Sequence, residues 1–115
     1  MVQTAIVSGG ARGIGRCLAR RSLERGYKVY VLDIDEDELR HTTHSHLKEY
    51  TDAKMLESSI CDLRNIEGIY EKVQEGAKFL GGHIDVLINN GGIASPQWKD
   101  GKTMYDRETV KEWQA

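Results

Sequence analysis

The sequence predicts an α/β fold, a doubly wound parallel sheet of four strands with helices on both faces. Apolar runs alternate with amphipathic segments, which is the pattern of β-α-β units. Glycine-rich or Asn-Gly turns follow the first and fourth runs, at residues 8–15 and 89–92. Right-handed crossovers give the strand order 3-2-1-4, which brings both turns to the crevice where the winding reverses. The runs expected as strands are residues 2–7, 28–32, 53–59 and 84–88.

Length and composition favour one soluble domain over residues 1–115. The formal net charge of −2 gives no general attraction to nucleic acid. No run of 18 apolar residues suggests a membrane span, and the first strand starts too early to leave room for a targeting segment. We therefore expect a cytoplasmic protein with neither a nucleic-acid nor a membrane partner.

The spacing of the cysteines and histidines does not indicate a metal site. Cys17 and Cys61 form neither a disulfide framework nor a metal motif, and we interpret both as small buried hydrophobic residues. His41, His44 and His46 lie in a polar helical segment, where His44 and His46 point to different sides. A solvated helical face explains this group better than a metal centre.

The strongest motif is the turn Ser8-Gly9-Gly10-Ala11-Arg12-Gly13-Ile14-Gly15 between the first strand and the first helix. The first N–H groups of a helix lack internal partners and lie at the positive end of its dipole, so they attract a phosphate. Gly9, Gly13 and Gly15 can make the turn, admit a pyrophosphate and let helix and strand pack closely. The alternative is a glycine turn that arose by chance.

This turn resembles the cofactor turn of the short-chain dehydrogenase/reductase family, whose pattern is Thr-Gly-x-x-x-Gly-x-Gly, with Ser8 in place of Thr. The resemblance implies a Rossmann-type fold and NAD(P)-dependent hydride transfer between the cofactor and an alcohol or carbonyl substrate. It covers residues 1 to about 113, which correspond to the N-terminal half of a typical member. By resemblance the cofactor-binding residues of the turn are Ser8, Gly9, Arg12, Gly13, Ile14 and Gly15.

Asp33 ends the second strand, 18 residues beyond Gly15. A carboxylate there can accept both ribose hydroxyls of an adenosine and would repel a 2′-phosphate, which favours NAD. Arg12 favours NADP instead, because members of the family that use NADP often have a basic residue at its position. We weigh Asp33 more heavily, and NADP stays open. The alternative for Asp33 is a helix N-cap or a surface acid that opens the acidic run 35–38.

Two later motifs complete the predicted cofactor site. By resemblance, Asp62 and Leu63 contact the adenine amine and the adjacent backbone, although Asp62 could also cap the next helix. Asn89 and Asn90, with Gly91, stand where the family has Asn-Asn-Ala-Gly, facing the cofactor across the crevice; taken alone, they would indicate a turn.

The buried faces of two helices follow from their apolar spacing. In the first helix we expect Ile14, Cys17 and Leu18 on one face, flanked by Ala19 and Leu23. A second stripe predicts a helix that ends at the glycine pair 81–82. Its apolar residues are Ile66, Ile69, Tyr70, Val73, Ala77 and Leu80.

The family's catalytic Asn, Ser and Tyr-x-x-x-Lys have no counterpart here, so we predict no catalytic residue in this chain. Tyr50 and Lys54 spell the last motif by accident, since Lys54 is expected to start the third strand. The sequence thus favours an oxidoreductase of this family that lacks its catalytic half, with a non-catalytic dinucleotide-binding or partner-binding module as the alternative. A methyltransferase is disfavoured by the Asn-Asn-Gly-Gly turn. An uncovered edge at the fourth strand predicts self-association or pairing with another chain.

Overall fold

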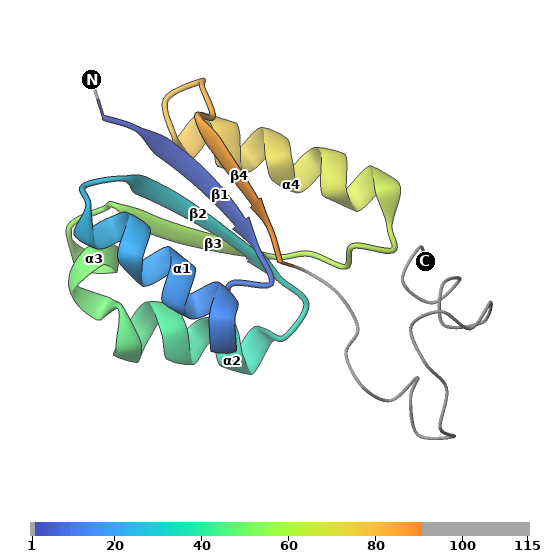
Figure 1. Ribbon diagram of the computed structural model, residues 1–115. Coiled ribbons are helices and arrows are strands. Elements are labelled where there is room, and N and C mark those ends of the chain that lie inside the picture. Colours follow the sequence, from blue (N-terminus) through green and yellow to red (C-terminus); the bar gives the residue numbers. More distant parts are fainter. Residues whose placement is uncertain (1, 91–115) are drawn as a thin grey trace, which may run out of the picture.

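The computed structural model describes residues 2–90, which form a single parallel sheet covered by helices (Figure 1). The strands lie in the order β3-β2-β1-β4, as predicted, and every neighbouring pair is parallel. Helices α1, α2 and α3 cover one face of the sheet, and α4 covers the other (Figure 1). The elements are β1 (Thr4–Ser8), α1 (Gly13–Glu24), β2 (Lys28–Asp33), α2 (Glu36–His41), the π-helical turn η1 (Thr42–His46), α3 (Lys48–Asp52), β3 (Leu56–Ile60), α4 (Ile66–Phe79) and β4 (Val86–Asn89).

The core has two layers because side chains alternate across each strand. Ala5 and Val7 of β1 face α1, whereas Ile6 between them faces α4. The first layer continues through Ala19 and Leu23 of α1. The central strands β1 and β2 are thus buried on both faces, as expected for a parallel sheet.

The buried face of helix α1 is rotated from the predicted one: the flanking residues Ala19 and Leu23 are buried in the core, whereas the burial expected for Ile14 and Cys17 is wrong. Gly15, Ala19 and Leu23 are buried at intervals of four, whereas Ile14 is 72% exposed and Cys17 is exposed. The cause is the glycine turn, against which Gly15 packs directly. The sequence prediction followed the larger apolar residues and missed this rotation. Cys61 is buried, as predicted.

Helix α4 contacts the sheet mainly through its C-terminal half. Gly76 is buried against the ring of Tyr30, where an added Cβ would lie 2.7 Å from Cδ2. Val73 packs against the same layer of the core. The predicted stripe extends too far towards the N-terminus, because Ile66 is 81% and Tyr70 is 70% exposed.

The strand boundaries also shift from those expected. Lys54 has a φ of 60° and lies in a turn, so β3 begins at Leu56 and Lys54 does not start it. Asp85 accepts a hydrogen bond from the backbone N–H of Thr4 at 2.8 Å, and β4 begins only after this contact. Among residues 2–90, no helix is long and apolar enough to cross a bilayer.

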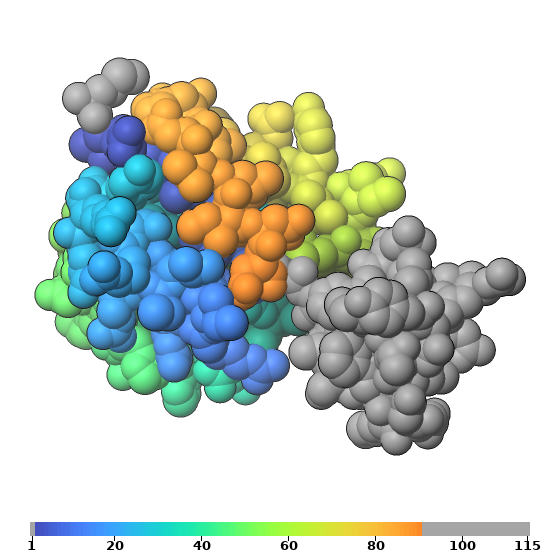
Figure 2. All heavy atoms as spheres, in the orientation of Figure 1, coloured from blue at the N-terminus to red at the C-terminus, as the bar shows by residue number. Residues whose placement is uncertain are grey.

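Strand β4 is the outer strand on its side of the described sheet. Leu87 is 67% exposed, and Val86, which points to the opposite face, is 36% exposed. Figure 2 shows the orange atoms of the β4 region at the surface, between the blue atoms of α1 and the yellow atoms of α4. Apolar surface is therefore present on both faces of this strand.

Candidate functional site: the crevice at the start of helix α1

The glycine turn between β1 and α1 has a backbone that favours glycine at two positions. Gly9 has a φ of 66° and Gly13 a φ of 59°, both in the left-handed region. The N–H of Gly9 donates to the carbonyl of Leu32 at 2.7 Å, which fixes the turn to the end of β2. An added Cβ on Gly13 would meet nothing within 4 Å, so the backbone at this position faces open space.

Gly15 stands where no side chain fits. An added Cβ would lie 2.7 Å from the carbonyl carbon of Gly9 and closer still to its oxygen. The side-chain amide of Asn90 occupies the same place, also 2.7 Å from that Cβ, and donates to the carbonyl of Gly9 at 3.2 Å. The first and last motifs of the sequence are therefore in direct contact.

Ser8 joins the ends of β1 and β4. Its hydroxyl accepts a hydrogen bond from the N–H of Asn90 at 3.1 Å and lies 3.2 Å from Oδ1 of Asn89 and 3.4 Å from the carbonyl of Ile88. The strand register pairs Ser8 with Asn89. Both asparagines predicted to face the cofactor thus lie beside the glycine turn. Gly91, predicted with them, is outside the described residues.

The N-terminus of α1 has the features of an anion site. The N–H groups of Gly13, Ile14 and Gly15 belong to the first turn of the helix, where no intrahelical acceptor is available. Arg12 is the N-cap residue and provides no side-chain cap, and no acidic residue lies in this turn. The positive end of the helix dipole is therefore not neutralised by a carboxylate of its own first turn.

Asp33 turns its carboxylate towards the glycine turn. Its Oδ2 accepts from the N–H of Ala11 at 3.1 Å, and its Oδ1 accepts from the N–H of Asp35 at 3.1 Å. Asp35 is the N-cap residue of α2, where it accepts from the N–H of Glu38, so the capping alternative for Asp33 is wrong. Each carboxylate oxygen has a second lone pair, which leaves Asp33 able to accept further hydrogen bonds.

Asp62 follows β3 at the same edge of the sheet, because Cys61 donates its N–H to the carbonyl of Asp33 at 2.8 Å. The Arg64 guanidinium donates to both Asp62 oxygens at 3.0 Å and holds the pKa of that carboxyl below its usual value. Asn65 is the N-cap of α4, so the capping role considered for Asp62 is wrong. Leu63 is 37% exposed beside it.

Thr42 forms a buried hydrogen bond to the glycine turn, a contact that the sequence analysis did not predict. Its buried hydroxyl donates to the carbonyl of Ala11 at 2.5 Å. Together with the Asp33 carboxylate, it holds both backbone groups of Ala11. No motif signals this contact, because it joins η1 to a turn 31 residues earlier in the chain.

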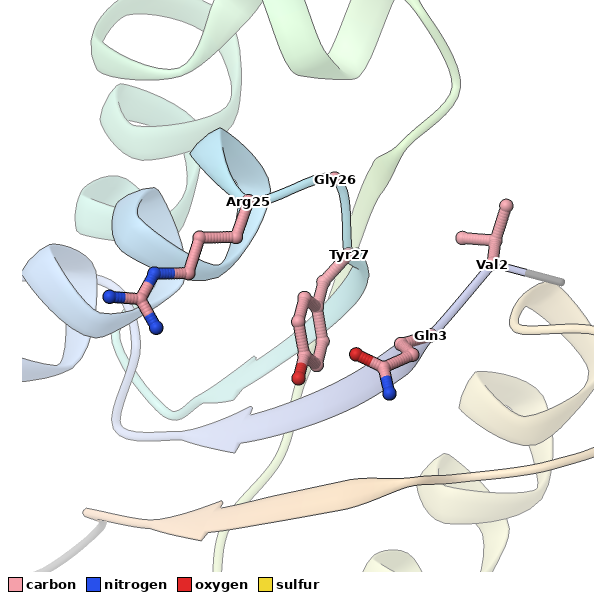
Figure 3. A pocket seen from close by; sticks show the side chains of 5 residues that line it. All are labelled: Val2, Gln3, Arg25, Gly26 and Tyr27. Carbon is pink, nitrogen blue, oxygen red and sulfur yellow. The ribbon is translucent and has the colours of Figure 1, made fainter.

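A hollow in the structure lies at the opposite end of the sheet. It is lined by Val2, Gln3, Arg25, Gly26 and Tyr27, where β1 and β2 begin (Figure 3). None of the predicted site residues lines it. Ligands of doubly wound sheets bind beyond the carboxyl ends of the strands, so this hollow is not the candidate site.

A four-stranded parallel sheet with a glycine turn at the reversal of its winding defines a Rossmann-type α/β domain. The chain belongs to the short chain dehydrogenase family, whose model matches residues 3–115. A CLA biosynthesis dehydrogenase/reductase from Lactiplantibacillus plantarum is 34% identical over 90 residues, which are 78% of this chain and 30% of that protein.

Two solved structures show the same arrangement. An actinorhodin polyketide ketoreductase solved with NADPH superposes with a TM-score of 0.75 at 29% sequence identity. The match covers 97% of this chain and 40% of the ketoreductase chain. A metagenomic short-chain oxidoreductase in complex with NADP has a TM-score of 0.67 at 33% identity, over 79% of this chain and 39% of its own. The chain spans 30% of the length of the relative from Lactiplantibacillus plantarum and 40% of the length of an uncharacterized oxidoreductase from Thermotoga maritima.

Proposed function

We propose that the chain is the cofactor-binding part of a short-chain dehydrogenase/reductase-type oxidoreductase and that it binds a nicotinamide dinucleotide at the start of α1. The observation that carries this proposal is the uncapped first turn of α1 beneath a glycine turn in which Gly9 and Gly13 have positive φ. Solved relatives with NADPH or NADP support the same cofactor class. The bound nicotinamide supplies a hydride acceptor or donor for an alcohol or carbonyl substrate.

Each predicted residue has a part in this binding. The N–H groups of residues 13–15 hold the diphosphate, and the space in front of Gly13 admits it. Asp33 accepts from the adenosine ribose, and Asp62 with Leu63 lies on the adenine side. Asn89 and Asn90 face the nicotinamide half, and Ser8 positions the two asparagines by the hydrogen bonds described above. Gly91, predicted with them, lies outside the described residues.

NAD is the favoured dinucleotide in this proposal. The Asp33 carboxylate lies at the turn, 3.1 Å from the N–H of Ala11, and would meet a 2′-phosphate with like charge. Arg12 is 69% exposed at its side chain and is the cation that could offset this repulsion for NADP. We give Asp33 more weight than Arg12 in choosing the cofactor, because two backbone N–H groups hold the Asp33 carboxylate in place.

We propose further that residues 1–115 form one cofactor-binding domain and that these residues by themselves bind the dinucleotide without turnover. Tyr50 lies in α3 and Lys54 in the following turn, so they do not share a helix face. Tyr105 is followed at the fourth place by Thr109, which supplies no cation to lower a tyrosine pKa. The absence of a Tyr-x-x-x-Lys pair on one helix face among these residues is also compatible with the alternative, a non-catalytic binding module.

The test is a calorimetric titration of the purified chain with NAD, NADP and S-adenosylmethionine, followed by an assay for alcohol oxidation with bound NAD. Dinucleotide binding without oxidation is the expected result. Binding of S-adenosylmethionine alone would contradict the cofactor class. Oxidation of any alcohol by residues 1–115 alone would contradict binding without turnover and leave the cofactor site standing.

We also propose that two copies of this chain associate through β4. The strand is apolar on both faces at the edge of the described sheet, with Leu87 67% exposed, and a second copy could pair with it about a two-fold axis.

The free thiols of Cys17 and Cys61 fit a reducing compartment, and we propose the cytoplasm as the location of the protein.

A further inference from the structure

Arg12 and Asp35 face each other at the mouth of the crevice. The Arg12 guanidinium Nη1 lies 3.8 Å from Oδ2 of Asp35, with side-chain exposures of 69% and 35%. Arg12 belongs to the glycine turn, whereas Asp35 comes from the loop after β2. This ion pair therefore bridges the two segments between which an adenosine ribose would lie.

Asp35 is held in position more firmly than its partner. Its Oδ1 accepts from the N–H of Glu38 at 3.1 Å, and its own N–H donates to Oδ1 of Asp33. Arg12, as the N-cap residue of α1, makes no side-chain cap bond. The carboxylate is thus anchored, and the guanidinium is the member of the pair that can move.

A 2′-phosphate carries close to two negative charges and would need the Arg12 guanidinium for itself. Drawing Arg12 towards the phosphate breaks its contact with Asp35, and it leaves the Asp35 carboxylate facing the phosphate without a counter-charge. A ribose with a free 2′-hydroxyl requires neither change. Asp35 consequently penalises the phosphorylated cofactor twice, by occupying Arg12 and by repulsion.

We propose that Asp35 is a specificity-determining residue which reserves Arg12 and so makes the site prefer NAD over NADP. This inference rests on the proposed dinucleotide site. It reconciles the opposite indications of Arg12 and Asp33, because an arginine engaged by a neighbouring carboxylate does not offer its charge to a 2′-phosphate. Asp35 acts on selectivity through Arg12, as a positioning residue.

The test variant is Asp35→Asn, because asparagine caps a helix as well as aspartate and so preserves the start of α2. The matched control is Glu36→Gln, which removes the same charge one residue away, where the carboxylate pairs with Arg40 at 3.5 Å. The measurement is calorimetric affinity for NAD and for NADP. We expect D35N to tighten NADP by roughly fivefold relative to E36Q, with NAD affinity changed by less than about twofold.

A double variant, Arg12→Gln with Asp35→Asn, shows whether the gain passes through Arg12. Relative to Arg12→Gln alone, the proposal predicts that this variant gains clearly less than fivefold for NADP, because only the repulsion by Asp35 is then removed. A gain in E36Q equal to that in D35N, or a full fivefold gain of the double variant over Arg12→Gln alone, would overturn the role of Asp35 and leave the dinucleotide site intact. Failure of the wild-type chain to bind either dinucleotide would instead overturn the proposed function, and the selectivity role with it.

Discussion

Replacement of Gly15 by alanine is the sharpest test of how the crevice is built. The new methyl group would lie 2.7 Å from the carbonyl carbon of Gly9 and 2.7 Å from the side-chain amide of Asn90. Ordinary van der Waals contact begins near 3.4 Å. The obstacle on one side is backbone, so relief requires the glycine turn or α1 to shift.

Overpacking of this kind costs about 1–3 kcal/mol. The displaced Asn90 amide also loses its bond to the Gly9 carbonyl, which is worth about 1 kcal/mol. We therefore expect Gly15→Ala to lower the free energy of unfolding by about 2–4 kcal/mol and to weaken NAD binding, because the same shift moves the N–H groups of the first turn.

Gly13→Ala is the matched control for this prediction. A methyl group at Gly13 meets nothing within 4 Å, so the cost there is only the strain of a φ of 59°, about 1–2 kcal/mol. Urea unfolding followed by circular dichroism measures both variants. A Gly15→Ala protein as stable as the wild type, or less affected than Gly13→Ala, would refute the packing described here.

Three further changes have expected outcomes. Asp33→Ala should remove the acceptor for the Ala11 N–H, lower the unfolding free energy by about 1 kcal/mol and weaken NAD more than NADP; an equal loss for both in calorimetry would contradict its ribose role. Arg64→Gln should raise the pKa of Asp62. Because Arg64 lowers that pKa, its contribution to stability is present at neutral pH and is lost as the pH falls below about 4. The wild type and the variant should therefore converge in acid, and parallel curves in pH-dependent unfolding would count against the pair. Leu87→Lys should shift the chain from dimer to monomer in light scattering, whereas a wild type that is already monomeric would exclude association through β4.

The strand order was predictable from the sequence because it follows from chirality and from two turns. The apolar runs alternate with helical segments, and right-handed crossovers fix the hand of each β-α-β unit. The two motif turns, placed where the winding reverses, then give the order 3-2-1-4. The position of Asp33 at the end of β2 likewise follows from the length of one β-α-β unit. These features depend on local patterns that a single sequence displays.

The faces of the helices were less predictable, because tertiary contacts override apolar spacing. Gly15 must pack on the turn, and this requirement rotates Ile14 out to 72% exposure. The support of the Ala11 carbonyl by Thr42 depends on a contact across 31 residues, which leaves no trace in local sequence. The engagement of Arg12 by Asp35 is of the same kind.

The most direct test of the central claim is an amide-resolved NMR titration of the chain with NAD. A diphosphate at the start of α1 should shift the N–H signals of Gly13, Ile14 and Gly15 first, with Ala11 next through Asp33. Signals of Gln3 and Tyr27, in the hollow at the opposite end, should stay in place. Shifts confined to that hollow, or none at residues 13–15, would contradict the account.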